Sequence, residues 1–397
     1  MIKLSERVQR LVPSATLAMA AKAAALRAQG VDVISFSMGE PDFDTPAHIK
    51  DAAKASLDRG FTKYTPIAGI PKLRAAIVRT LKEDRGLEYA ADEVTVTCGG
   101  KQAIANALLT LVGPGDEVII PAPYWVSFPA QVELADGVPV IIDTAATGLK
   151  LTPEALARAV TQKTRVLILN SPSNPSGIVY TAQEVHALAQ VCLDHRIAVI
   201  SDEIYEHLLF DGMRHVSIVQ AEPRMRPFTV IANGMSKSFA MTGWRLGWAV
   251  GPREVIAKMN ELAGQQTTHA TSFVQEAGIA ALEGSRDDLA KMVAAFEQRR
   301  NRMHEQLVAI PGVACHMPQG AFYHFPDMRG VIGKQFRGVT IENDADLVRI
   351  LLEEAHVATV DGTSFGAPGF IRLSYATSLE AIDEGMERIR RVLTECA

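Results

Sequence analysis

Residues 233–247 of the chain read NGMSKSFAMTGWRLG. In this stretch Lys237 stands between two serines, and Arg245 follows eight residues later between two glycines. An amine, a hydroxyl and a guanidinium that lie together can bind an aldehyde and an anionic group on one ligand. The same residues also suit a loop that leads into an apolar strand, with Lys237 in solvent. The rest of the chain decides between these two interpretations.

The segment around this stretch, from about residue 47 to residue 284, alternates between helical and strand patterns. The predicted strands are 93–97, 116–121, 138–142, 165–170, 197–201, 229–232 and 246–250, and helices are predicted between most of them, for example at 71–85 and 181–194. Apolar runs such as 166–169 and 197–200 suit strands that are buried on both faces. We therefore predict an α/β fold in which helices sandwich a mostly parallel sheet.

The pattern changes after residue 284. Helices are predicted at 285–309, 343–355 and 378–394, with short strands at 313–316, 321–325, 357–360 and 370–374. This mixture indicates a smaller α+β domain. Near the N-terminus, a helix at 14–29 and a strand at 31–36 precede the larger segment.

Composition and length describe a globular protein that is large enough for about two to three domains. The chain has 397 residues, of which 48% are apolar and 21% charged, and its net charge of −5 gives no basic surface for nucleic acid. Four cysteines are scattered without a C-x-x-C pair, which is typical of reduced thiols in the cytoplasm and of neither a disulfide framework nor a metal site. The charged N-terminus is unlike a signal peptide, and no uncharged run reaches about 18 apolar residues, so we predict no membrane span.

A glycine pair follows the first of the predicted strands, at the edge where ligands of such sheets bind. Residues 98–103 read CGGKQA and lead into a helix, whose free backbone N–H groups favour an anion. Lys101 in the first turn of that helix opposes the helix dipole unless an anion lies nearby. The alternative for Lys101 is an ordinary surface lysine.

Two more polar motifs follow later strands. Residues 170–177 read NSPSNPSG, and their two prolines and glycine predict a rigid loop around Asn174. Residues 201–205 read SDEIY and place Asp202 at the end of the next strand. Glu203 is a second carboxylate next to Asp202 that could take the same role. Because successive side chains of a strand alternate, Glu203 is expected to point to the opposite face.

Two further side chains are unusual for their surroundings. Trp125 follows a strand, where a flat indole suits stacking on a planar ring, although most tryptophans belong to a core. Arg372 lies in the apolar strand 370–374, where burial of a guanidinium is costly unless it meets an anion. A planar guanidinium holds a carboxylate through two hydrogen bonds, so Arg372 indicates a carboxylate ligand or a structural salt bridge.

Taken in order, the Asn-Pro loop, the Asp-x-x-Tyr motif, the lysine segment and the arginine strand resemble the class I aminotransferases, and in particular their aspartate aminotransferase subgroup. The resemblance covers nearly the whole chain. It implies the cofactor pyridoxal 5′-phosphate (PLP), fold type I, and a large PLP-binding domain over residues 49–284. It also implies a small domain formed by residues 1–48 together with residues 285–397.

The resemblance implies a role for each motif. Lys237 would bind the cofactor aldehyde and transfer a proton, Asp202 would keep the ring nitrogen protonated, and Tyr205 would donate to the phenolic oxygen, so these three are the predicted catalytic residues. The predicted cofactor-binding residues are Tyr64, Gly99, Gly100, Lys101, Trp125, Asn174, Asp202, Tyr205, Ser236, Lys237 and Arg245. The predicted substrate-binding residues are Gly39, Lys101, Trp125, Asn174 and Arg372, and no metal is expected.

The implied reaction moves an amino group between an amino acid and a 2-oxo acid. Aspartate and glutamate are the favoured donors, because Lys101 in the Gly-Gly-Lys pattern of this subgroup would contact the distal carboxylate. Aromatic amino acids or prephenate are the alternative, because neutral and acidic side chains share such pockets in this subgroup. Met38, His269 and Asp361 depart from the family pattern, which argues against strict specificity for aspartate. Less favoured are a PLP-dependent lyase of the same fold and a PLP-binding regulator, which would need a DNA-binding segment before residue 30.

The resemblance also implies a homodimer with shared active sites. In this family the tyrosine that Tyr64 matches reaches the cofactor phosphate of the neighbouring subunit. We expect a cytoplasmic enzyme that binds amino acids and 2-oxo acids, and we expect it to bind neither nucleic acid nor a membrane.

Overall fold

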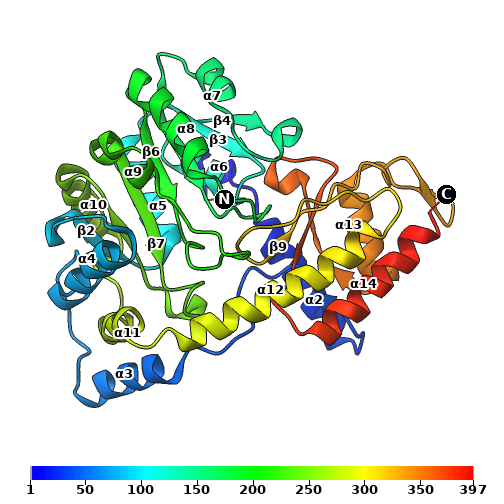
Figure 1. Cartoon of the computed structure of the whole chain (residues 1–397), viewed down its shortest axis with the longest axis horizontal. Helices are drawn as coiled ribbons and strands as arrows, with labels where there is room; N and C mark the ends of the chain where they lie inside the picture. The colour runs from blue at the N-terminus through cyan, green and yellow to red at the C-terminus, as the bar shows by residue number, and fades with distance from the viewer. Residues whose placement is uncertain (1, 397) are drawn as a thin grey trace.

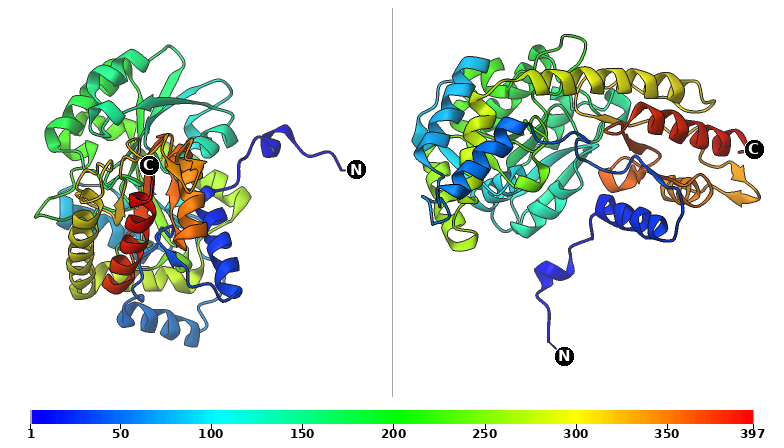
Figure 2. Two further views of the ribbon diagram at one scale, coloured as in Figure 1. Left: turned by 90° about the vertical axis from the view of Figure 1, so that its right-hand side faces the viewer. Right: turned by 90° about the horizontal axis from the view of Figure 1, so that it is seen from below.

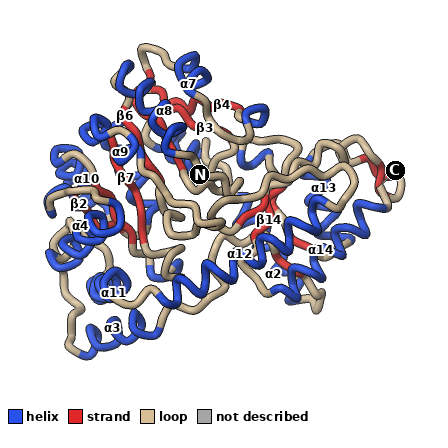
Figure 3. The backbone as a smooth tube through the Cα atoms, in the orientation of Figure 1, coloured by secondary structure: helices blue, strands red, loops and turns tan. Residues whose placement is uncertain are grey.

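The computed structural model describes residues 2–396 and contains one large sheet with helices around it (Figure 1, Figure 3). The sheet has seven strands in the order β2-β8-β7-β6-β5-β3-β4. Their bounds are β2 Val94–Thr97, β3 Glu117–Ala122, β4 Val138–Asp143, β5 Thr164–Asn170, β6 Ala198–Asp202, β7 Thr229–Gly234 and β8 Gly247–Val250. Neighbouring strands run parallel except β8, which is antiparallel to both β2 and β7. The predicted α/β fold is confirmed, and all seven predicted strands are present with ends shifted by a few residues at most.

Helices lie before, between and after these strands as far as residue 283. They are α1 Glu6–Gln9, α2 Ala15–Ala28, α3 Ala47–Asp58, α4 Pro71–Arg85, α5 Gly100–Leu111, α6 Ser127–Leu134, α7 Pro153–Ala159, α8 Ala182–His195, α9 Ile218–Ala221, α10 Arg253–Gln266 and α11 Ser272–Glu283. The predicted helix α4 has Pro71 at its first position and ends at Gly86 in the left-handed conformation. The predicted helix α8 follows a capping box, in which Thr181 and Glu184 each accept a hydrogen bond from the backbone N–H of the other.

Alternate residues of the central strands face two separate apolar cores. Val166 and Ile168 of β5 pack into the core that includes residues of α5 and α10. Leu167 and Leu169 of the same strand pack into the other core, which includes residues of α4, α8 and α11. Successive side chains of a strand point to opposite faces, so a sheet covered on both sides requires a continuous apolar run.

The chain after α11 builds a smaller α+β unit. Its helices are α12 Asp287–Val308, α13 Asp344–Glu354 and α14 Leu379–Thr394, close to the predicted ranges. Its strands are β9 Tyr323–His324, β10 Gln335–Phe336, β11 Val339–Thr340, β12 Val357–Ala358, β13 Val360–Asp361 and β14 Ile371–Ser374. Strand β14 pairs antiparallel with both β13 and β9, and β10 pairs with β11. The strand predicted at 313–316 is wrong, because only Ala314 has a partner there, Asp327, and a strand needs a partner along its length.

The N-terminal residues join this smaller unit. Strand β1, Ile34–Ser35, pairs in parallel with β12, and α2 packs against β12 and β13. Phe36 lies in the same apolar core as Phe296 and Leu347. These contacts support the predicted grouping of residues 1–48 with 285–397, although the exact domain boundaries stay a prediction. The residues before α2 form an arm that extends away from the rest of the chain (Figure 2).

The helices within residues 2–396 do not meet the requirements of a membrane span. None of them combines the length and the apolar character that crossing a bilayer demands.

Strand β8 begins where the sheet meets the first turn of α5. A Cβ atom on Gly247 would stand 2.4 Å from the backbone nitrogen of Gly100. Because the obstructing atoms belong to backbone, they cannot rotate away as a flexible side chain could. Gly243, earlier in the same stretch, has open space where its Cβ would be. Gly247 is therefore needed for close approach of the strand to the helix, and Gly243 is not.

We expect Gly247→Ala to lower the free energy of unfolding by about 3 kcal/mol, the upper end for overpacked sites, because its methyl group meets backbone. The matched control is Gly243→Ala, which should change the free energy of unfolding by less than about 0.5 kcal/mol. Urea unfolding followed by intrinsic fluorescence gives the midpoints of the two variants and the parent chain. Equal midpoints for the two variants would contradict the packing explanation.

Candidate active site

A cavity of about 340 Å³ brings together residues of the large sheet and of the smaller unit. Its wall includes the carboxyl ends of β5 and β6, the first turn of α5, the loop after β7, and residues of β9 and β14. The predicted residues that line it are Gly39, Gly100, Lys101, Trp125, Asn174, Asp202, Tyr205, Ser236, Lys237, Arg245 and Arg372. Gly99 lies against Arg245 just outside this lining, whereas Tyr64 lies elsewhere.

Lys237 follows β7 and extends its amine into the cavity. Its Nζ atom donates a hydrogen bond to the carbonyl oxygen of Gly39 at 2.5 Å. Burial lowers the pKa of Lys237 to about 8, although the negative charge of Glu40 opposes part of this effect. The amine therefore loses its proton far more readily than a solvated lysine does, which makes it a better nucleophile and base near neutral pH.

Asp202 ends β6 and is buried at the base of the cavity. Its Oδ1 atom accepts one hydrogen bond, from the backbone N–H of Ile204 at 3.3 Å. Burial raises the pKa of Asp202 to about 7, with a smaller contribution from the neighbouring charge of Glu203. A cation or a protonated nitrogen beside this carboxyl group would favour its charged form.

Glu203 points away from the cavity, as strand alternation predicts. It is fully buried and forms ion pairs with Arg85 and, at 3.2 Å, with His215. Its Oε1 atom also accepts a hydrogen bond from the hydroxyl of Ser201 at 2.8 Å. Although burial alone would raise the pKa of Glu203, the charges of Arg85 and His215 hold it well below its usual range. This carboxylate is a structural ion-pair partner, and Asp202 is the one that faces the cavity.

Arg372 belongs to β14, and its buried guanidinium lines the cavity. Its Nη1 atom donates to Oδ1 of Asn174 at 2.9 Å, and its Nη2 atom donates to the carbonyl oxygen of Ser37 at 2.7 Å. Its Nε atom has no hydrogen-bond partner, and no carboxylate among residues 2–396 forms an ion pair with the guanidinium. The ring of Tyr323 lies 4.5 Å from the guanidinium carbon. A buried cation with neutral partners fits an anionic ligand better than a structural salt bridge.

The loop after β5 supports this guanidinium. Asn174 is buried, and its backbone N–H donates to Oδ1 of Asn170 at 2.9 Å. Asn170 in turn donates to the carbonyl oxygen of Asp202 at 3.1 Å. The peptide bonds before Pro172 and Pro175 are cis. One hydrogen-bonded chain therefore links Arg372 to the end of the strand that carries Asp202.

A second group of donors surrounds the first turn of α5. Gly99 caps this helix with a φ of 86°, and a Cβ there would stand 2.6 Å from Nη2 of Arg245. Arg245 uses Nη1 to donate to the carbonyl oxygen of Thr242 at 2.9 Å, which orients the guanidinium toward the helix. The hydroxyl of Ser236 completes the group on the cavity wall. A helix N-terminus, a guanidinium and a hydroxyl together form a site for an anion such as phosphate.

Lys101 and Trp125 lie together on another part of the wall. The Nζ atom of Lys101 stands 4.8 Å from the centre of the Trp125 ring. Desolvation, and then the positive charge of Arg245, lower the pKa of Lys101 below its ordinary value. Lys101 has no carboxylate partner among the described ion pairs, so it adds a third cation to the cavity without an anion beside it.

Tyr64 differs from the other predicted residues because it neither lines the cavity nor packs against a residue that does. It is 90% exposed and lines a separate hollow together with His269. The two rings meet edge to face with centres 5.6 Å apart, and Nε2 of His269 accepts a hydrogen bond from the N–H of Thr65 at 3.3 Å. Within this chain Tyr64 therefore does not line the cavity.

Tyr323 is a cavity residue that the sequence reasoning missed. Its hydroxyl lies 2.9 Å from the hydroxyl of Tyr205, and a Cβ on Gly39 would stand 3.0 Å from it. The predicted strand 321–325 contains Phe322, Tyr323 and two other apolar residues, so nothing in the pattern separates a cavity tyrosine from core aromatics. Burial raises the pKa of Tyr205 well above its ordinary value, so both hydroxyls keep their protons for hydrogen bonding.

The three residues that depart from the family pattern lie in different places. Met38 lines the cavity, whereas His269 belongs to the hollow beside Tyr64. Asp361 caps a turn, where its Oδ1 accepts hydrogen bonds from the N–H and the hydroxyl of Ser364 at 2.8 and 2.7 Å. Of the three, Met38 is therefore placed to contact a ligand within this chain.

Comparisons with known proteins agree on one family. The model for aminotransferase class I and II matches residues 31–389. The chain is 49% identical over 393 residues to an aspartate aminotransferase of Geobacillus stearothermophilus, with 99% of each chain covered. It is 44% identical over 397 residues to an aspartate/prephenate aminotransferase of Nitrosomonas europaea, with 99% of this chain and 100% of the relative covered.

Solved structures give the same result. The aspartate aminotransferase from Rhizobium meliloti superimposes with a TM-score of 0.97 at 42% identity, with 100% of each chain covered. The aspartate aminotransferase from Thermus thermophilus with maleate superimposes with a TM-score of 0.93 at 43% identity, with 99% of this chain and 100% of that chain covered. The chain therefore belongs to the class I and II aminotransferases and is a PLP-dependent enzyme.

Proposed function

We propose that the enzyme transfers the amino group of aspartate or glutamate to a 2-oxo acid in this cavity. The observation that carries this proposal is that, besides Arg245 of the anion site, the cavity holds two more cations without an ion-pair partner, Arg372 and Lys101, together with the Lys237 amine. A dicarboxylic amino acid has two carboxylates for these cations and an α-amino group to place near Lys237. The relatives named aspartate aminotransferases support the same substrate class.

The residues of the cavity fit PLP by their chemistry. When bound, PLP supplies an aldehyde that reacts with amines and a protonated ring that withdraws electrons. Asp202 is buried without a cationic partner close enough to hold it ionised, and a ring N–H⁺ would provide one. The anion site of Gly100, Ser236 and Arg245 matches a phosphate group, and the indole of Trp125 offers a flat face to the ring.

In this proposal each polar side chain of the cavity has a separate role in binding or proton transfer. Arg372 and Asn174 orient the substrate α-carboxylate, and Lys101 holds the distal carboxylate. The free amine of Lys237 takes the proton from the substrate Cα, for which a pKa of about 8 is well suited. The carbonyl oxygen of Gly39 then accepts a hydrogen bond from the protonated amine, as it does in the structure.

We also propose a homodimer in which Tyr64 of each copy reaches the cavity of the other. The 90% exposure of Tyr64 in the single chain supports this assembly, because a large exposed aromatic side chain is available for contact with a second copy. The exposed apolar residues Ile2 and Val12 of the N-terminal arm also suit contact with a second copy. A cytoplasmic location is proposed from the four cysteines, all of which are free thiols.

A second substrate class has support from the same cavity. Leu17, Met38 and Ile104 line it with apolar side chains that a ring could contact. A relative that shares 44% identity is named an aspartate/prephenate aminotransferase. We therefore keep aromatic amino acids or prephenate as the alternative donors or acceptors.

We expect Lys101→Ala to lower kcat/KM for aspartate by about 30- to 100-fold, equivalent to the loss of one charge-assisted hydrogen bond of about 2–3 kcal/mol. The kcat/KM for phenylalanine should change by less than about 3-fold, because that side chain has no carboxylate. The measurement is steady-state transamination with each donor and 2-oxoglutarate. Lys163→Ala, an exposed lysine before β5, is the control and should leave both donors unaffected. An equal loss of kcat/KM for the two donors would show that Lys101 does not recognise the distal carboxylate.

We expect Lys237→Ala to lower amino transfer by at least about 1,000-fold, because the general base is removed. Borohydride reduction of the PLP-loaded parent chain should add the mass of one cofactor at residue 237, and the variant should gain none. Lys101→Ala serves as the control and should still gain that mass. Cofactor mass on another lysine of the parent chain would show that the anchoring residue is misassigned.

The lowered pKa of Lys237 predicts a pH dependence in the cofactor-free protein. The neutral amine is the reactive form, and it predominates above a pKa of about 8 instead of near the ordinary value of 10.5. The rate of labelling of residue 237 by pyridoxal, which lacks the titrating phosphate, should rise through pH 8 and level off above it. Mass spectrometry after reduction measures this rate, with Lys237→Ala as the blank. A midpoint near pH 10 would mean that the amine is solvated.

A further inference from the structure

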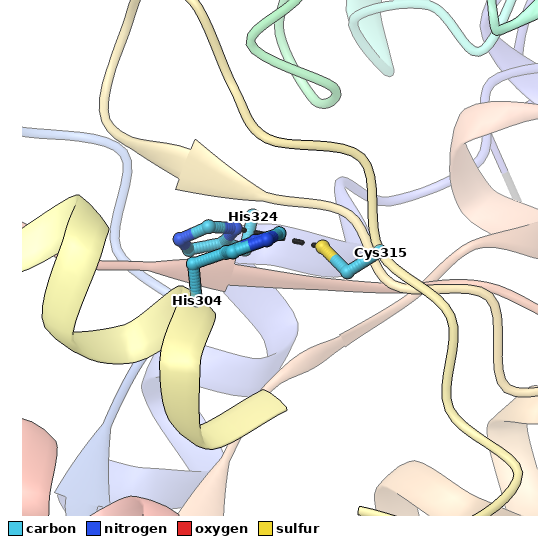
Figure 4. Close-up of side chains that lie close together, drawn as sticks. All are labelled: His304, Cys315 and His324. Carbon is cyan, nitrogen blue, oxygen red and sulfur yellow. Dashed lines mark hydrogen bonds between the residues drawn. The ribbon is translucent and has the colours of Figure 1, made fainter. Parts of the chain in front are cut away.

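Three side chains with metal-ligating atoms meet behind the active-site cavity. His304 comes from α12, Cys315 from the loop after it, and His324 from β9, next to the cavity residue Tyr323 (Figure 4). One ligand atom of each residue lies within 4.8 Å of the others. The rings of His304 and His324 are stacked, with centres 5.5 Å apart and planes inclined by 24°. Successive residues of β9 therefore face a catalytic cavity on one side and this cluster on the other.

The hydrogen bonds of His324 fix which ring nitrogen faces the cluster. Its Nε2 atom lies 3.0 Å from the backbone carbonyl oxygen of Arg300, which can only accept, so Nε2 carries the proton. The lone pair of Nδ1 then faces the sulfur of Cys315 at 3.5 Å. Metal-binding histidines commonly donate their second ring nitrogen to a backbone carbonyl in this way, which orients the ring and its lone pair.

His304 contributes a second nitrogen that the protein leaves without a partner. Its Nδ1 atom is shielded from solvent and forms no hydrogen bond within residues 2–396. Leaving a buried polar nitrogen unpaired costs about 1–3 kcal/mol. His304 and Cys315 are both only partly buried, so an ion could enter from the surface between them.

We propose that His304, Cys315 and His324 form a binding site for a Zn²⁺ ion. Two imidazole nitrogens and one thiolate suit this borderline-soft ion, and a water molecule would complete its tetrahedron. Tetrahedral bonds of about 2.0 Å to nitrogen and 2.3 Å to sulfur place neighbouring ligand atoms about 3.5 Å apart. The Cys315–His324 separation of 3.5 Å already meets this value. The wider separations, up to 4.8 Å, would have to close by rotation of the partly exposed His304 ring when the ion binds.

The charges around the cluster allow this binding. The thiol proton of Cys315 leaves to solvent when the ion binds, so the site gains one positive charge. The nearby guanidinium of Arg300 is already held by both carboxylate oxygens of Asp211, at 2.6 and 2.8 Å. The alternative without a metal is a partly buried hydrogen bond between Cys315 and His324, with the ring of His304 stacked on that of His324. The sequence alone favours this alternative, because the three ligands have no spacing of a known zinc motif.

The test is equilibrium dialysis of the PLP-loaded enzyme against Zn²⁺ after treatment with a chelator. We expect one zinc ion per chain that is retained by the parent protein. Cys315→Ser and His304→Gln should each weaken binding by at least about 100-fold, at or beyond the upper end for loss of a supporting partner. Cys396→Ser, at a free cysteine just after α14, is the matched control and should bind zinc like the parent.

X-ray absorption and thermal unfolding test the same site independently of the dialysis. X-ray absorption of the zinc-loaded parent should show one sulfur and two imidazole ligands. Zinc should also raise the melting temperature of the parent and of Cys396→Ser but not of the two ligand variants, since binding to the native state stabilises it. Absence of retained zinc, equal zinc affinity in all four proteins, or a zinc spectrum without sulfur would each overturn the proposal. These readouts do not depend on transamination, so they fail or succeed independently of the proposed function.

Discussion

Burial of ionisable groups without matching counterions is the constraint on which this active site depends. Asp202, Lys237 and Arg372 all line one cavity, yet none of them is neutralised by a close ion pair. Burial shifts the pKa of each toward its neutral form, so each is held at a cost to folding. A ligand with complementary charges recovers this cost on binding. Part of the free energy that favours binding of a complementary ligand is therefore built into the fold of the cavity.

The contrast between Asp202 and Glu203 shows how the backbone assigns these roles. The two carboxylates are adjacent in sequence and both are buried, but strand alternation sends them to opposite faces. Glu203 forms ion pairs with Arg85 and His215, which lower its pKa. Asp202 faces the cavity, and burial raises its pKa to about 7. One peptide unit thus separates a structural carboxylate from one that is available to a ligand.

Much of the fold could be predicted because it rests on local patterns. The strands of the large sheet were visible as apolar runs, and the motifs at their carboxyl ends placed most of the cavity residues. Contacts between distant segments were harder to predict. Tyr323 looks like a core aromatic in sequence, and only the fold places its hydroxyl beside that of Tyr205. The strand expected at 313–316 is a short, mostly apolar run, but only Ala314 has a pairing partner, and pairing is a tertiary property.

The single reversed strand of the large sheet has a consequence for the order of assembly. Because β8 runs antiparallel beside β7, with Gly234 opposite Gly247, the short connection between them returns to the edge from which it left. Lys237 and Arg245 become neighbours through this local hairpin-like link, at little loop-closure entropy. Arg372 instead reaches its position through a contact with Ser37, which lies 335 residues away in sequence. Lys237 and Arg245 are thus brought together by a local connection, whereas the contact of Arg372 with Ser37 requires closure of almost the entire chain.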